Sequence, residues 1–204
     1  TNGDQRGLEY IEQALQSLDP VANPLETANA LSTQARFHHL AGRHKKAIEI
    51  LMRANELIVP TAEGEEVSSF AAPMIAQLYA YLAGGYQHYG LYTDSNEWAN
   101  RAVKFGTSHN VYFAEATGYE FLGENTVHTG EFTLGLEYAE KEFALAAKLQ
   151  SRERKAWTHF FAAHCHMELG QLLEAERNFE DGLALAESIG ENRLKWLHKP
   201  NLAV

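Results

Sequence analysis

The 204-residue chain has little cysteine, an excess of acid over base, and no long apolar run. Cys165 is the only cysteine, so no disulfide can form within the chain, which is compatible with a reducing compartment. The formal net charge of −10 argues against binding a nucleic-acid backbone, because that requires clustered Lys and Arg. No apolar run approaches the roughly 18 residues that span a membrane, and no signal peptide is visible. We therefore expect a cytoplasmic protein that contacts neither nucleic acid nor membrane.

The sequence also lacks the motifs of common enzyme chemistry. It contains no GxxxxGK[ST] phosphate loop, no GxGxxG after a strand, no HExxH and no GxSxG. His164 and His166 would point about 200° apart on a helix and cannot share one ion, while the spacing of His39 and His44 across a turn decides nothing. No base or cation is fixed beside Cys165, so we expect an inert buried thiol. These absences predict no enzyme, no cofactor and no metal site.

What the sequence does contain is a repeat. Gly42, Gly90, Gly130 and Gly170 follow one another at intervals of 48, 40 and 40 residues, and each lies between two runs with helical spacing. Small or apolar residues recur at fixed offsets from these glycines: Ala35, Ala83, Gly123 and Ala163 seven before; Ala47, Ser95, Gly135 and Ala175 five after; Leu51, Ala99, Ala139 and Phe179 nine after. Where two antiparallel helices cross closely, one side must be small. The twelfth position after the turn (Ala54, Ala102, Gly182) follows the same rule, but Glu142 breaks it.

This pattern resembles the tetratricopeptide repeat (TPR). The matching segments are LAGRHKKAIEILMRA, YGLYTDSNEWANRA, HTGEFTLGLEYAEKEF and ELGQLLEAERNFEDG, with a bulky residue two positions after each turn glycine (His44, Tyr92, Phe132, Leu172). The period of about 40 is similar to the long-helix variety found in MalT-like bacterial regulators and in animal scaffold proteins that orient spindles. The resemblance implies an all-α, right-handed superhelical solenoid of antiparallel helix hairpins.

We expect one TPR-like solenoid segment over 1–204, excised from a longer protein. It would comprise a half repeat at 1–20 whose helix covers Gly7–Leu18, repeats at about 25–58, 73–106, 112–149 and 153–190, and the start of a further helix at 191–199. Pro73 suits a first helical turn, and Gly106 and Gly190 suit left-handed C-caps. The irregular insertion 59–72 is expected to be an exposed loop, with room for a short helical turn. It is either a binding loop or a tolerated insertion, because long surface insertions cost little.

In the repeats that this chain resembles, the first helix of each pair lines the concave groove, at positions thirteen, ten, six and three before the turn. In the first two repeats the lining residues are Asn29, Ser32, Arg36, His39, Gln77, Ala80, Gly84 and Gln87, with His88 beside them. In the last two they are Thr117, Glu120, Glu124, Val127, Trp157, Phe160, His164 and Met167, with His128 beside them. We predict that this set contacts a partner.

The lining changes in character along the groove. It is amide-rich with one Arg in the first two repeats, acidic in the third, and aromatic in the fourth. Trp157, Phe160 and Met167 could anchor a partner peptide, or the two aromatics could pack against the following helix. The Lys, Asn and Arg cluster that clamps a peptide carboxylate is missing, so a partner with a basic residue and an apolar anchor fits better.

We therefore predict a non-catalytic signalling scaffold for protein–protein interaction that binds a peptide or helix in its groove. The alternative is a ligand-sensing, regulatory arm of a larger bacterial signalling ATPase or transcriptional regulator. The sequence leaves the oligomeric state open.

Overall fold

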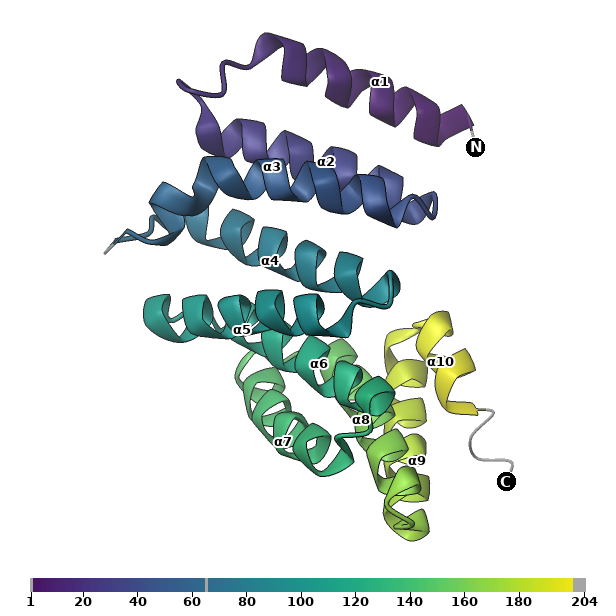
Figure 1. Ribbon diagram of the computed structural model, residues 1–204. Coiled ribbons are helices and arrows are strands. Elements are labelled where there is room, and N and C mark those ends of the chain that lie inside the picture. Colours follow the sequence, from purple (N-terminus) through teal and green to yellow (C-terminus); the bar gives the residue numbers. More distant parts are fainter. Residues whose placement is uncertain (1, 65, 200–204) are drawn as a thin grey trace. The chain divides into compact units, whose positions relative to one another are not determined.

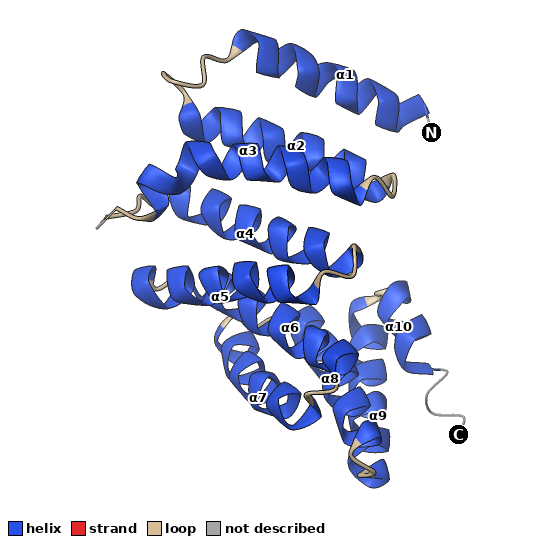
Figure 2. Cartoon of the chain, viewed as in Figure 1, coloured by secondary structure: helices blue, strands red, loops and turns tan. Residues whose placement is uncertain are grey.

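The computed structural model describes residues 2–64 and 66–199, with side chains from Arg6 onward, and within these residues it is all-α. Figures 1 and 2 show helices joined by short turns, with no strand among the described residues. The helices described are α1 (Asn2–Ser17), α2 (Pro24–Leu40), α3 (His44–Ala62), α4 (Ala71–His88), α5 (Tyr92–His109), α6 (Tyr112–Thr129), α7 (Phe132–Lys148), α8 (Arg152–Glu168), α9 (Leu172–Ile189) and α10 (Asn192–His198). Successive helices pair as hairpins, which confirms the predicted fold class.

The four turn glycines all have a left-handed backbone. Their φ angles are 72° at Gly42, 80° at Gly90, 82° at Gly130 and 73° at Gly170. A residue with a Cβ is disfavoured in this conformation, so glycine is the residue that lets one helix end and its partner begin three or four residues later. The repeat period in the sequence is therefore the period of these turns.

The small-residue columns lie at the helix crossings, as the sequence predicts. Ala35, Ala83 and Ala163 are at most 1% exposed. A Cβ added to Gly123 would lie 2.5 Å from the Phe161 ring, which occupies that space. The columns thus confirm that each hairpin is closed by small residues that admit a bulky neighbour.

The chain divides into two compact units, residues 1–114 and 115–204. In the first unit, α1 to α5 pack in order, and α2 also contacts α4. In the second unit, α7 packs on α8, α8 on α9, and α10 on both α8 and α9. Each unit buries its own apolar residues, such as Leu82 in the first and Phe161 in the second, both at most 1% exposed.

Two predicted boundaries are wrong. α3 continues to Ala62 with Pro60 in its last turn, so part of the predicted loop is helical. Proline removes one backbone hydrogen bond, which is tolerable so close to a helix end. α5 continues through Gly106, which is buried inside it, and the left-handed cap is Asn110 with φ 57°. By contrast, Gly190 caps α9 with φ 74°, as predicted.

Two further expectations concern the ends of α1 and α4. α1 begins at Asn2, five residues before the predicted start. Pro73 lies in the first turn of α4, as predicted, but α4 begins at Ala71. Among the described residues, no helix is long and apolar enough to cross a membrane.

Candidate functional site

The first helices of the first unit, α2 and α4, present a polar surface. They contact each other, and the side chains of Asn29 and Arg36 on α2 and of Gln77 on α4 are exposed. Gln77 donates its amide to the Tyr81 hydroxyl at 2.9 Å. Ser32, from the same predicted set, is buried and donates its hydroxyl to the Ala28 carbonyl at 2.8 Å. The exposed members therefore offer amide and guanidinium groups on adjacent helices.

The structure brings together three histidines at one end of this surface. The Nδ1 atoms of His39 and His44 lie 3.1 Å apart, and the ring of His88 lies with its centroid 4.8 Å from that of His39. The His88 Nδ1 donates to the Gly84 carbonyl at 2.7 Å. Burial, with His88 and His44 nearby, lowers the pKa of His39 to about 4. The His39 imidazole is therefore neutral near pH 7.

This cluster does not form a recognisable metal centre. Among the described residues, no three His, Cys, Asp or Glu side chains are placed so that they could hold a metal ion. Cys165 is fully buried, and its thiol lies 3.9 Å from the Thr126 hydroxyl. Burial raises the pKa of this thiol, which opposes thiolate formation.

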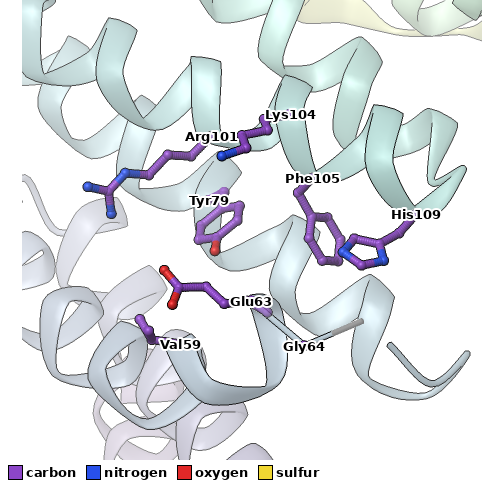
Figure 3. A pocket seen from close by; sticks show the side chains of 9 residues that line it. Val59, Glu63, Gly64, Tyr79, Arg101, Lys104, Phe105 and His109 are labelled. Atoms are coloured by element: carbon purple, nitrogen blue, oxygen red, sulfur yellow. The ribbon is translucent and has the colours of Figure 1, made fainter. Parts of the chain in front are cut away.

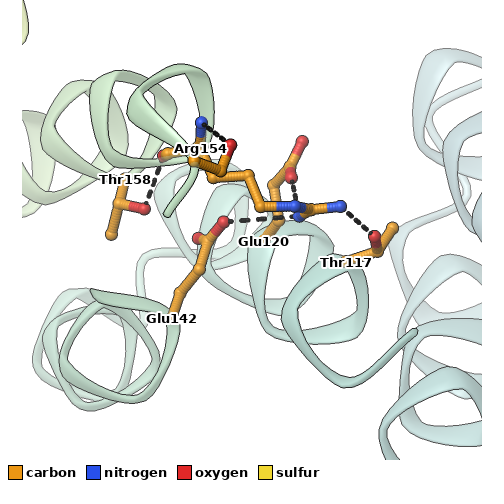
Figure 4. A network of polar contacts seen from close by, with 6 residues as sticks. Thr117, Glu120, Glu142, Arg154 and Thr158 are labelled. Atoms are coloured by element: carbon orange, nitrogen blue, oxygen red, sulfur yellow. Dashed lines mark hydrogen bonds and ion pairs between the residues drawn. The ribbon is translucent and has the colours of Figure 1, made fainter. Parts of the chain in front are cut away.

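In the second unit, the predicted acidic stretch forms a buried polar network (Figure 4). The Arg154 guanidinium of α8 donates from Nη1 to the Glu120 carboxylate of α6 at 2.8 Å and from Nη2 to the Thr117 hydroxyl at 2.5 Å. The same Nη1 lies 3.7 Å from Oε1 of Glu142, which comes from α7 and is fully buried. Thr158 donates its hydroxyl to the Arg154 carbonyl at 2.8 Å. One guanidinium thus faces two carboxylates.

The excess of carboxyl groups over guanidinium groups affects the protonation of Glu120 and Glu142. Among the described residues, neither carboxylate oxygen of Glu142 has a hydrogen-bond donor. Burial raises the pKa of Glu142 well above its usual value, and the Glu120 carboxylate adds to the rise. Burial also raises the pKa of Glu120, to about 7, against the opposing effect of Arg154. The network therefore retains a proton near neutral pH.

The network explains the one break in the small-residue columns. Glu142 occupies the position held by Ala54, Ala102 and Gly182 in the other repeats, so its side chain enters the hairpin interior. The sequence marked this position as an exception, but it did not identify Arg154 as the opposing charge, because Arg154 lies 12 positions later, beyond a turn, and only the packing of α8 on α7 brings the two together. Glu120, predicted to contact a partner, has Arg154 as an internal partner.

The predicted aromatic stretch lies on α8, where α10 partly covers it. The Arg193 guanidinium lies 5.0 Å from the centroid of the Trp157 ring. The Phe160 ring lies 5.6 Å from that of His198, which is fully buried and whose Nε2 lies 3.1 Å from the Ala156 carbonyl oxygen. Trp157 and Phe160 both remain half-buried rather than fully enclosed. The contacts match the packing alternative, and a role in binding stays a prediction.

The remaining predicted site residues are spread over both units. Gln87 on α4, Glu124 on α6, and His164 and Met167 on α8 are half-buried, and His128 on α6 is exposed. Burial lowers the pKa of His164, whose ring lies 4.7 Å from that of Phe160. The predicted site residues therefore do not form one site. They lie in and around three local groups: the polar surface with the histidines, the acidic network, and the aromatic side chains beside α10.

The sequence matches no established protein family, and no curated protein matches it. The fold is similar to that of BtubC (BKLC) from P. vanneervenii, with a TM-score of 0.73, 16% identity, and coverage of 98% of this chain and 79% of that chain. It is also similar to two crystal structures of TPR-like repeats of a putative kinesin light chain from Podosopora anserina. These have TM-scores of 0.65 and 0.62, identities of 18% and 20%, and cover 94% and 92% of this chain and 91% and 90% of theirs. The fold of this chain is therefore TPR-like.

Proposed function

We propose that the chain is a non-catalytic protein-interaction scaffold that binds a peptide or a helix on the exposed faces of its first helices. The observation that carries this proposal is the polar surface on α2 and α4, where Asn29, Arg36 and Gln77 are exposed on helices in contact. Amide and guanidinium groups can bond both the N–H and the C=O groups of an extended backbone. Protein binding through such a surface is consistent with a TPR-like fold.

The second unit has a candidate binding surface of its own, which would take side chains of a peptide. Trp157, Phe160 and Met167 keep exposed area that an apolar residue could cover, as interface anchors do. Glu120 and Glu124 on α6 are half-buried, and their carboxylates would attract a basic residue of the peptide. The peptide that fits this second surface therefore has one basic and one apolar anchor.

The test is a selection of peptides against the folded chain, followed by affinity measurements on the enriched sequences. A triple variant, Asn29→Ala with Arg36→Ala and Gln77→Ala, should bind those peptides about tenfold more weakly or worse, since each lost tenfold is about 1.4 kcal/mol. All three positions are exposed, so circular dichroism should show an unchanged fold.

The matched control replaces three exposed residues on the second helix α3: Lys46→Ala, Glu49→Ala and Arg53→Ala. This variant should bind like the parent. If the selection enriches no peptide, or if the α2/α4 variant binds as tightly as the control, the proposed interaction surface is wrong.

Two finer points belong to the same proposal. The period of about 40 favours the long-helix TPR variety and a signalling scaffold, and the single cysteine is compatible with a cytoplasmic setting. The alternative function, a ligand-sensing arm of a bacterial signalling ATPase or transcriptional regulator, is favoured by the cavity described below. A P-loop domain or a helix-turn-helix in the same gene product would support that alternative.

A further inference from the structure

The first unit contains a cavity of about 470 Å³, a volume typical of small-molecule sites. It lies where the last turn of α3 meets α4 and α5 (Figure 3). The polar and aromatic residues lining it are Glu63, Tyr79, Arg101, Lys104, Phe105 and His109. None of them belongs to the polar surface of α2 and α4.

The insertion after the first repeat builds one wall of this cavity. The extra turn of α3 places Val59 and Ala62 on the lining, and Glu63 follows directly. The opposite wall is one face of α5, because positions 101, 104, 105 and 109 fall within about 140° of the helix circumference. The inserted residues of this repeat therefore line a cavity, and they do more than lengthen the connection between α3 and α4.

The lining carries charges of both signs in separate places. Arg101 and Lys104 are basic, whereas the Glu63 carboxylate lies across the cavity from them, near the Tyr79 hydroxyl (Figure 3). Arg101 is held in place by a 2.7 Å bond to Glu97 and by the Trp98 ring, whose centroid lies 4.2 Å from its Cζ. A guanidinium has five N–H groups, so this bond leaves others for a ligand.

The aromatic side chains form the apolar part of the cavity. Tyr79 is 8% and Phe105 5% exposed, and their ring centroids lie 6.0 Å apart in an edge-to-face arrangement. The His109 ring lies 4.8 Å from that of Phe105. Burial raises the pKa of Tyr79, with Arg101 opposing the rise and Glu63 adding to it. A tyrosine hydroxyl is protonated near neutral pH. It can therefore donate a hydrogen bond.

We propose that this cavity binds a small zwitterion of the amino-acid class with an apolar side chain. Lys104 and Arg101 would hold the carboxylate, Glu63 would hold the ammonium group, and Phe105 would cover the side chain. Glu63 would repel a ligand that carries only a negative charge, and Arg101 and Lys104 would repel a ligand that carries only a positive charge. A ligand with both charges therefore fits the lining best. This site is independent of peptide binding on α2 and α4.

The test measures binding of L-phenylalanine, L-leucine and L-methionine to the full chain by saturation-transfer NMR and calorimetry. The best ligand is compared with analogues that lack one charge; for L-phenylalanine these are 3-phenylpropionate and L-phenylalaninamide. The amino acid should bind about tenfold more tightly than either analogue. Lys104→Gln should weaken the amino acid but not the amide, and Glu63→Gln should weaken the amino acid but not 3-phenylpropionate.

Lys46→Gln, an exposed lysine on α3 outside the cavity, is the matched control and should change nothing. The α2/α4 triple variant should still bind the amino acid, which separates this proposal from the interaction surface. The proposal is overturned if none of the amino acids binds at about 10 mM. It is also overturned if a singly charged analogue binds as tightly as the amino acid, or if both cavity variants bind like the parent.

Discussion

Replacing Glu142 by Gln tests the buried network most directly. Glutamine has nearly the same shape, so the change removes one negative charge and leaves the packing of the hairpin in place. In the parent, Arg154 faces both Glu120 and Glu142 at distances of 2.8 and 3.7 Å. In the variant the guanidinium faces one carboxylate, and the buried charges balance. We therefore expect Glu142→Gln to stabilise the chain at alkaline pH.

The sign and size follow from the raised pKa values. A carboxyl whose pKa is higher in the folded state keeps its proton on folding, so its contribution to stability is greatest at low pH and falls as pH rises through the folded pKa. For Glu120, a rise from 4.5 to about 7 corresponds to about 3 kcal/mol. Because the two carboxyls compete for protons around one guanidinium, we expect the variant to gain about 1 to 3 kcal/mol near pH 8. The gain should shrink as pH falls and be lost below the usual pKa of 4.5, because Glu142 is then protonated in both the folded and the unfolded chain.

The assay is urea unfolding of parent and variant across this pH range, analysed as the difference between the two proteins. Histidines with lowered pKa values also titrate here, and the subtraction removes their contribution. Hydrogen exchange of the α7 and α8 amides localises the effect to the second unit. A difference that does not change with pH, or a variant that loses stability near pH 8, would refute the reasoning.

Three further predictions follow from contacts in the second unit. Arg154→Met should cost about 3 to 5 kcal/mol near neutral pH in urea unfolding, because Glu120 loses the guanidinium that it pairs with and the buried Glu142 loses the cation 3.7 Å away; a cost within error of zero would contradict this. Gly182→Ala should loosen α10, since the new methyl would overlap the His198 ring, and adding His198→Ala should restore part of the loss of about 1 to 3 kcal/mol; unchanged exchange of α10 amides would count against it. Burial lowers the pKa of His198, so its contribution to stability is present above the usual value of 6.5 and is lost as pH falls; on acidification, α10 amides should lose protection relative to their intrinsic exchange rates in the parent but not in His198→Ala.

The sequence by itself determined the hairpin architecture. The turn glycines and the small residues around them are local requirements, one for a left-handed backbone and the other for a close helix crossing. Both can be recognised without knowing the rest of the fold. The helix ends were less well determined: Gly106 and Asn110 both suit a cap, and packing decided that α5 continues to His109.

The tertiary structure decided which side chains meet. Glu142 stood out in the sequence only as an exception, and its meaning came from Arg154, brought opposite by the hairpin. Glu63 and Lys104 lie far apart in the chain, and they line one cavity because the extra turn of α3 brings Glu63 to the face of α5 that carries Lys104. Periodicity follows from local backbone and packing rules, whereas charge pairing and cavities depend on distances between helices that the sequence does not contain.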